Sequence, residues 1–286
     1  MNAIHRSLLT LAALFVGTIA PVGVHFKVEA QQGSAAAIDA ALAGSHRSDA
    51  NKARDRYRHP KETLAFFGLR PEMTVVEIWP GGGWYTEVLA PVLHERGKLY
   101  VAQYGSKPPF PYQQREMDTL AAKLRANPDL YRAVTPTALN FFTNELTIAP
   151  PGSVDLVLTF RNVHNWFEEG YGPPNAAQLA FKAMFTALKP GGMLGVVDHR
   201  WPDPATEDPG AKNGYISEKR VIELAEGAGF ELVATSEINA NPKDSKDYAE
   251  GVWTLPPTLT LGEQDKARYL AIGESDRMTL KFRKPD

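Results

Sequence analysis

The stretch 77-EIWPGGGWYTEVLA-90 decides the fold, because it joins two unlike segments through a proline and three glycines. The apolar, β-branched run 73–79 in front of the glycines predicts a strand. The run 84–97 behind them has the composition of a helix. Gly81 and Gly83 permit positive φ and close approach of a ligand, and a helix start offers free N–H groups. The stretch therefore predicts a strand–turn–helix unit that can hold a ligand.

The remainder of the chain repeats this alternation of strands and helices. Further strands are predicted at 98–104, 131–137, 154–160, 193–199, 231–238 and 278–284, and helices at 112–128, 175–192 and 217–230. Strands that alternate with helices form βαβ units, which give a mostly parallel sheet covered on both faces. The expected fold class is α/β: a doubly wound, Rossmann-like sheet of seven strands.

The N-terminus has the pattern of a secretory signal. Two basic groups, His5 and Arg6, precede an apolar run from Leu8 to Ala20, which is short for a membrane span. The small residues of 28-VEA-30 suit cleavage before Gln31, the alternative being an anchor that is never cleaved. The sequence therefore predicts a signal peptide over 1–30 and an exported protein, periplasmic or secreted, without a stable membrane anchor after cleavage.

Three further segments follow the predicted signal. The Ala-, Gly- and Ser-rich residues 31–50 are expected to form a linker or a loosely packed leading segment. Residues 51–286 are expected to form one domain, which begins with a helical extension interrupted near Pro60. Within it, the polar segment 239–276 is either an insertion beside the carboxyl edge of the sheet or a surface loop without a role.

The composition excludes several functions. The net charge is −2 and Lys and Arg form no basic block, so no nucleic-acid partner is expected. The chain has no cysteine, which excludes disulfides, a thiol nucleophile and a Cys-based zinc site. His46 and His59 lie far along the chain from the other histidines, so no metal site is indicated, although folding could still assemble one. The phosphate-loop, H-E-x-x-H and G-x-S-x-G motifs are absent.

Polar and ionisable residues that could bind a ligand or catalyse a reaction follow two of the predicted strands. Ligands of open α/β sheets bind beyond the carboxyl ends of the strands, where 160-FRNVHNW-166 and 197-VDHRW-201 are expected. His164 is a candidate general base, or it hydrogen-bonds only its own loop. Asp198 and His199 are candidates for orienting a proton-transfer group, or they form a structural pair with Arg200.

The glycine turn argues against a dinucleotide. The third glycine of that fingerprint would fall at position 86, which is Thr86. An acid that binds a ribose diol is expected about 20 residues further along, and Gln103 stands there without a charge. Gln103 therefore either contacts a ribose or caps its strand.

The motifs together resemble a known family. The run 75–90 is similar to the first motif of class I S-adenosylmethionine-dependent methyltransferases, with Glu77 at the position of their acid. The runs 154–166 and 180–199, with L-K-P-G-G inside the second, resemble later motifs. The R-N-V segment is similar to the quinone C-methyltransferase branch, and the whole is similar to exported methyltransferase-like proteins. The final run 276–285 resembles the closing strand, which implies an antiparallel last strand between the fifth and sixth.

The resemblance implies S-adenosylmethionine as the cofactor and a set of residues that hold it. Glu77, Gly81 and Gly83 would flank the methionine part, and Gln103 takes the place of the ribose-binding acid. Arg161 and Asn162 follow the strand where the family contacts cofactor and substrate. Tyr85 and Thr86 complete the expected set, with the open question whether the aromatics Trp84 and Tyr85 line the pocket or fill it.

The expected function is methyl transfer to a small-molecule acceptor. Because the cofactor is already activated, the protein mainly aligns the acceptor with the methyl group, and His164 or His199 can remove a proton. One alternative is an exported, non-catalytic binding protein that has lost the cofactor. Another is a different reaction in the same cleft, carried by His164, Asp198 and His199. The oligomeric state stays open.

Overall fold

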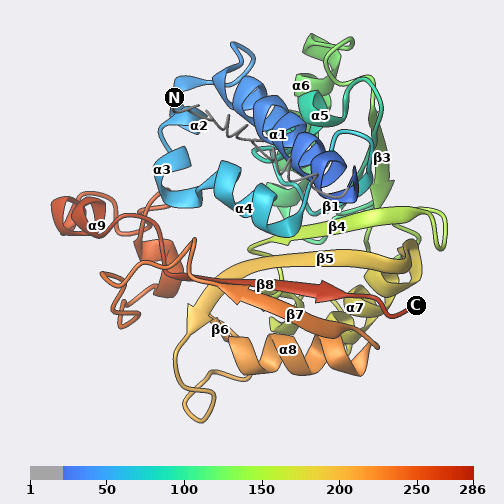
Figure 1. Ribbon diagram of the computed structural model, residues 1–286. Helices are drawn as coiled ribbons and strands as arrows, with labels where there is room; N and C mark the ends of the chain where they lie inside the picture. Colours follow the sequence, from blue (N-terminus) through green and yellow to red (C-terminus); the bar gives the residue numbers. More distant parts are fainter. Residues whose placement is uncertain (1–21) are drawn as a thin grey trace, which may run out of the picture.

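The computed structural model describes residues 22–286 (Figure 1). Its sheet has the strand order β3-β2-β1-β4-β5-β8-β7, and a short β6 pairs with β5. The strands are β1 (Thr74–Ile78), β2 (Lys98–Gln103), β3 (Val134–Ala138), β4 (Val154–Phe160), β5 (Leu188–Trp201), β6 (Ile216–Ser217), β7 (Glu231–Ser236) and β8 (Arg277–Arg283). The expected doubly wound α/β sheet is confirmed, with eight strands in place of seven because the two-residue β6 gives no apolar signal.

The last strand runs against its neighbours. Strands β1 to β5 pair in parallel, whereas β8 is antiparallel to both β5 and β7. This position between the fifth strand and the penultimate long strand is the one expected for the closing strand. The carboxyl ends of β1, β2, β4 and β5 therefore meet at one edge, where the switch in strand order opens a crevice.

Helices cover both faces of the sheet (Figure 1). They are α1 (Val22–Ala43), α2 (Asp49–Lys52), α3 (Asp55–Arg58), α4 (Pro60–Phe67), α5 (Thr86–Leu93), α6 (Pro111–Ala126), α7 (Ala176–Ala187), α8 (Glu218–Gly227) and α9 (Lys266–Ile272), with 3-10 turns η1 (His164–Phe167) and η2 (Gly251–Thr254). One core holds Val75 with residues of α1, α4 and α5, and the other holds Val76 with residues of α7 and α8. Successive strand residues thus face opposite buried layers, which explains the continuous apolar strands.

The expected linker over 31–50 is wrong. Residues 31–43 continue α1, and Ile38 and Ala41 are only 1% and 3% exposed in the core that contains Leu64 and Leu89. Alanine is the strongest helix former, so the Ala-rich composition indicated a helix and not a flexible connection. Most of the predicted signal, residues 1–21, lies outside the described residues. Within the described part, no helix is long and apolar enough to cross a membrane.

Two helix boundaries illustrate local proline chemistry. The predicted interruption near Pro60 is confirmed, because α3 ends before His59, which has a φ of 40°, and Pro60 begins α4. The helix predicted over 175–192 instead ends at Ala187, and Leu188 already pairs with Val154 of β4. The segment with Pro190 is thus the start of β5, since proline donates no hydrogen bond to continue a helix.

Candidate functional site

A cavity of about 700 Å³ lies at the carboxyl ends of the central strands. It takes Trp79, Pro80, Gly81 and Gly82 from the turn after β1, and Phe160, Arg161, Asn162, His164 and Asn165 from the segment after β4. Its other walls come from Arg54 and Arg58 near α3, from Tyr112, Glu116 and Lys123 of α6, from His199 of β5, and from Trp253 and Thr258. A volume of this size is typical of small-molecule sites.

Five of the eleven predicted site residues line this cavity, namely Gly81, Arg161, Asn162, His164 and His199. The other six lie behind its wall, namely Glu77, Gly83, Tyr85, Thr86, Gln103 and Asp198. The second group supports the first through hydrogen bonds and packing, as the following contacts show. Sequence spacing therefore brought these residues to one region but did not separate residues that line the cavity from residues behind its wall.

The glycine turn is held by its carbonyl groups. Gln103 Nε2 donates to the Gly81 carbonyl at 3.0 Å, and Lys123 Nζ donates to the carbonyls of Gly82 and Gly83 at 2.8 and 3.2 Å. Within the described chain, the N–H groups of Gly81 and Gly82 have no hydrogen-bond partner. A buried or ligand-facing N–H group needs a partner, so these two donors are available to a carboxylate or another acceptor in the cavity.

Glu77 and Thr86 form a buried pair behind the turn. The Thr86 hydroxyl donates to Glu77 Oε2 at 2.7 Å, and the Glu77 side chain is fully enclosed. Burial raises the pKa of Glu77 to about 7, against the opposing effects of the Thr86 hydrogen bond and of Lys123. This pair ties the end of β1 to the first turn of α5 and thereby fixes the glycine turn between them.

The raised pKa of Glu77 predicts a pH-dependent stability. The folded-state pKa of Glu77 exceeds the unfolded value of about 4.3. Ionising Glu77 therefore lowers the free energy of unfolding, and this loss is absent at low pH and grows as the pH rises from about 4 to about 7. Glu77→Gln keeps an acceptor for Thr86 and does not ionise. We expect it to match wild type near pH 4 and to exceed it by about 1–3 kcal/mol above pH 7. Urea unfolding across this pH range measures the difference; parallel curves for the two proteins would contradict it.

The two aromatic residues of the turn have different positions. Trp84 lines the cavity, and its Nε1 donates to the Asn51 carbonyl at 3.1 Å. Tyr85 stacks on Phe160 with 3.6 Å between ring centroids and an interplanar angle of 9°, behind the wall. Neither ring fills the cavity. Trp84 is one of its lining residues, whereas Tyr85 packs behind the cavity wall.

A carboxylate reaches the turn from α6. A Cβ atom added to Gly81 would lie 3.3 Å from the Glu116 carboxyl group, which also accepts a hydrogen bond from the Tyr104 hydroxyl at 2.7 Å. Gln103, at the end of β2, turns its amide under the glycine turn instead of into the cavity. A carboxylate therefore lies beside the glycine turn on the neighbouring helix, where spacing along the sequence does not reveal it.

His164, Asp198 and His199 come together as a buried cluster. His164 Nδ1 lies 2.8 Å from Asp198 Oδ1, which also accepts the backbone N–H of His199 at 2.7 Å. Asp198 Oδ2 accepts the backbone N–H of His164 at 3.1 Å. The carboxylate assigns the proton to Nδ1 of His164 and leaves Nε2 as an acceptor. His164 thereby has the arrangement of a general base oriented by a carboxylate.

His199 has a different electrostatic environment. Its Nδ1 is hydrogen-bonded to the Ser275 hydroxyl. Burial is the main cause that lowers the pKa of His199 well below its ordinary value, and the neighbouring His164 and arginines act in the same direction. His199 is therefore neutral at physiological pH, and it serves as a hydrogen-bonding wall of the cavity beside His164, with 5.1 Å between the two ring centroids.

In the described part of the chain, this cluster is the one group of side chains with the spacing of metal ligands, because its ligand atoms lie within 4.8 Å of one another. The sequence indicated no such group, since residues 164 and 198 are brought together only by the sheet. Two observations disfavour a divalent ion there. The Asp198 oxygens already accept three N–H groups, and arginines surround His199.

Several cavity residues were not predicted from the sequence. Arg54, Arg58, Glu116 and Trp253 line the cavity from segments outside the sheet. The alternating basic run 52-KARDRYR-58 was a signal for the two arginines. Trp253 belongs to the segment 239–276, which therefore contributes to the cavity instead of lying apart from it. Glu116 had no local signal, because it is one of several charged residues on a surface helix.

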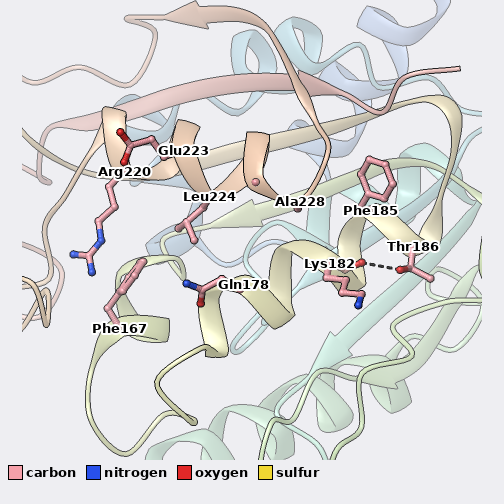
Figure 2. Close-up of a pocket in the computed structure, with 10 residues that line it drawn as sticks. Phe167, Gln178, Lys182, Phe185, Thr186, Arg220, Glu223, Leu224 and Ala228 are labelled. Atoms are coloured by element: carbon pink, nitrogen blue, oxygen red, sulfur yellow. Dashed lines mark hydrogen bonds between the residues drawn. The ribbon is translucent and has the colours of Figure 1, made fainter.

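A second hollow of about 790 Å³ lies between α7 and α8 (Figure 2). Arg220 stacks over the ring of Phe167 with 3.6 Å to its centroid, and Phe185, Leu224 and Lys182 complete the walls. None of the predicted site residues lines it. The cavity at the strand ends is therefore the candidate functional site.

Comparison with solved structures identifies the fold. A SAM-dependent methyltransferase from Aquifex aeolicus superposes with a TM-score of 0.52 and 17% identity, over 81% of this chain and 93% of that one. The chain has the Rossmann-like methyltransferase fold. Geranyl diphosphate C-methyltransferase from Streptomyces coelicolor A3(2), solved with Mg²⁺, geranyl diphosphate and S-adenosyl-L-homocysteine, has a TM-score of 0.53 and 14% identity over 86% and 87% of the chains.

The same fold also carries another reaction. The 4+2 cyclase SpnF matches with a TM-score of 0.56 and 15% identity, over 85% of this chain and 86% of that one. No family model and no curated protein matches the sequence. Because one fold supports several chemistries, the reaction has to be argued from the cavity itself.

Proposed function

We propose that this protein is an S-adenosylmethionine-dependent methyltransferase that acts on a small-molecule acceptor. One observation carries the proposal. The same cavity is lined by a glycine turn with unpaired N–H groups and by His164, whose ring is oriented by a carboxylate. The methyltransferase fold supports it, since the cavity lies at the carboxyl edge where such a fold binds ligands.

The cavity offers partners that match the cofactor's polar groups. The N–H groups of Gly81 and Gly82 suit the carboxylate of its methionine part, and the Glu116 carboxylate suits ribose hydroxyls, which donate to an acid. When bound, the cofactor supplies a methyl group that is already activated on a sulfonium. The residues of this chain then have to orient the acceptor, exclude water and move a proton.

Asn162 and His164 prepare the acceptor side. Asn162 Nδ2 donates to the Ile78 carbonyl at 2.9 Å and to the Thr159 hydroxyl at 3.2 Å, which fixes the loop after β4 against β1. On this loop, His164 Nε2 accepts the proton that an O–H, N–H or acidic C–H acceptor loses. Asp198 stabilises the resulting imidazolium through the hydrogen bond to Nδ1.

Calorimetric titration with S-adenosyl-L-homocysteine tests the cofactor half of the proposal. We expect saturable binding, weakened about tenfold in Glu116→Gln because a charge-assisted hydrogen bond is replaced by a neutral one. Asp118→Asn, an exposed carboxylate change on the same helix, is the matched control and should bind as wild type. Absence of binding at millimolar concentration would sink the methyltransferase proposal and favour the binding-protein alternative.

A different reaction in the same cavity is the second candidate, because SpnF shows that a cyclase uses this fold. The pair His164 and His199 favours this candidate, because two histidines in a cavity can support proton transfer in a reaction without a methyl donor. The two candidates separate in one measurement. A methyltransferase releases one S-adenosyl-L-homocysteine for each product molecule, whereas the second candidate forms product with the cofactor unchanged.

We also propose that the protein is exported, from the signal-like residues 1–30. The proposed cleavage before Gln31 falls inside α1 and keeps Ile38 and Ala41 on the mature chain. N-terminal sequencing of protein recovered from outside the cytoplasm should begin at Gln31. An intact N-terminus on a membrane-bound protein would support the uncleaved anchor instead.

The position of that cleavage predicts which truncation the fold tolerates. A chain that begins at Gln31 should be as stable as the full chain, because Ile38 and Ala41 stay in the core. A chain that begins at Asp49 loses both and should be less stable by at least about 2 kcal/mol, the lower end for removing one buried aliphatic side chain. Urea unfolding of the two truncated chains and the full chain measures this, and equal stability of the two truncated forms would contradict it.

A further inference from the structure

One wall of the cavity carries more positive charge than the protein neutralises. Arg54, Arg58 and Arg277 all pair with the single carboxylate of Glu274, the first two with N···O distances of 2.6 and 3.5 Å from their Nε atoms. Arg161 stands beside these three arginines and beside the Asp198 carboxylate, which is already engaged with His164. Three guanidinium groups on one acid, with a fourth close by, leave an uncompensated positive field.

Among these four arginines, Arg161 is the one without a carboxylate partner in the described residues. In residues 22–286 its guanidinium makes no ion pair or hydrogen bond with another side chain, although it lines the cavity. Burial and the repulsion of Arg277 and Arg54 lower the pKa of Arg161 to about 10. Its backbone is held by an N–H bond to the Val197 carbonyl at 2.7 Å and has a φ of 62°. The fold therefore holds this side chain at the cavity at an energetic cost.

Arg58 has an ion-pair partner in Glu274 and lies over the Trp84 ring at 4.4 Å, but it keeps unpaired N–H donors. Its side chain is 4% exposed, it lines the cavity, and its Nε and Nη2 atoms have no hydrogen bond. Arg54 Nη2 is likewise without one. Buried N–H donors of a charged group are costly when unpaired. Several such donors around one space are what an oxyanion satisfies, since guanidinium forks match carboxylate and phosphate oxygens.

We propose that the acceptor carries an oxyanion group, a carboxylate or a phosphate, which Arg58 and Arg161 bind within the cavity. The assignment of the anion to the methyl acceptor rests on the proposed function, whereas the anion site itself does not. The anion site lies on the side of the cavity that His199 lines, because the charges of Arg161 and Arg58 act on His199. The anion would place the rest of the acceptor beside His164, and it would offset the positive sulfonium of the cofactor in the same cavity.

Binding of inorganic phosphate and of acetate, measured by calorimetry in a buffer free of other oxyanions, tests the site. Wild type should bind one or both, and Arg161→Gln should weaken binding about 10- to 100-fold, the loss of a charge-assisted hydrogen bond. Arg161→Lys should retain part of the affinity. Arg56→Gln, which removes an exposed arginine of α3 that does not line the cavity, should bind as wild type. Equal binding by Arg161→Gln and wild type, or no binding by wild type, would overturn the site.

Thermal unfolding without added anion separates this role from a structural one. Removing an unpaired cation from a repulsive group should stabilise the fold, so the Tm of Arg161→Gln should rise by about 2–4 °C. A structural arginine would lower Tm when removed. A fall in Tm together with unchanged phosphate affinity would therefore count against the proposal, while a rise together with lost affinity would support it.

The source of the oxyanion is decided by competition. If the anion belongs to the acceptor, phosphate should bind in the presence of saturating S-adenosyl-L-homocysteine. If S-adenosyl-L-homocysteine displaces phosphate while 5′-methylthioadenosine, which lacks the amino-acid end, does not, the arginines hold the cofactor's carboxylate and the acceptor assignment is wrong. If phosphate binds and S-adenosyl-L-homocysteine does not bind at all, the anion site stands and the methyltransferase proposal fails.

Discussion

His164→Gln is expected to lower the kcat of methyl transfer by about 10²- to 10⁴-fold while leaving binding of S-adenosyl-L-homocysteine unchanged. The reason is the geometry of the cluster: Asp198 fixes the proton on Nδ1, so Nε2 is the atom that we propose as the acceptor of the proton. Glutamine fills a similar volume but does not accept a proton near neutral pH. The measurement is release of S-adenosyl-L-homocysteine with a panel of small carboxylates and phosphate esters as acceptors.

Two further variants sharpen this result. Asp198→Asn should also lower kcat, because the imidazolium loses its carboxylate partner. His94→Gln, which changes a histidine outside the cavity, should behave as wild type. A His164→Gln enzyme with wild-type kcat would show that proton removal is left to water or to another group, and would leave His164 as a hydrogen-bonding residue of its loop.

Glu274→Gln is expected to cost about 3–5 kcal/mol of unfolding free energy, the effect of breaking a buried ion pair by removing one partner. Glu274 is the carboxylate shared by Arg54, Arg58 and Arg277, and its side chain is 2% exposed. Without it, the buried charges of Arg58 and Arg277 have no counter-ion from the protein. Urea unfolding at pH 7 measures the loss. Glu237→Gln, at a largely exposed partner of Arg200, is the control and should cost less than about 1 kcal/mol.

The pH dependence of the same variant follows from the pKa of Glu274. Although burial opposes it, the charges of Arg277 and Arg58 hold the pKa of Glu274 well below its ordinary value. A depressed carboxyl pKa contributes stability that is complete above the unfolded value of about 4.3 and is lost as the pH falls below it. The difference between wild type and Glu274→Gln should therefore shrink on acidification. A constant difference between pH 7 and pH 3 would contradict the ion-pair explanation.

The site was predicted only in part, and the reason is visible in particular residues. Gly81, Arg161, His164 and His199 were found because parallel strands bring their carboxyl ends to one edge. Glu77 and Thr86 were placed correctly near the turn, yet their side chains bond to each other behind it. Spacing along a strand locates a residue at an edge. It does not say which way a side chain turns when a buried partner competes with a ligand.

The error over 31–50 has a similar origin. Alanine, glycine and serine are shared by linkers and by small-residue faces that pack closely, and composition alone does not separate the two. Ile38 and Leu42 are the two large apolar side chains in that stretch; Ile38 is buried in the core of that face, and Leu42 packs against it partly buried. Two large apolar residues, one helical turn apart among alanines, give a weak periodic signal, so the burial of this helix follows from the tertiary neighbours it meets.

By itself, the sequence determined the strands, the glycine turn and the doubly wound sheet, because apolar runs, glycine and proline act on the backbone within a few residues. Only the tertiary structure decided the charges of the cavity. Arg54 and Glu274 are 220 residues apart and meet through the packing of the α3 region against the start of β8. Which cations gather around one carboxylate, and which has no carboxylate partner, depends on distances across the fold that no local pattern encodes.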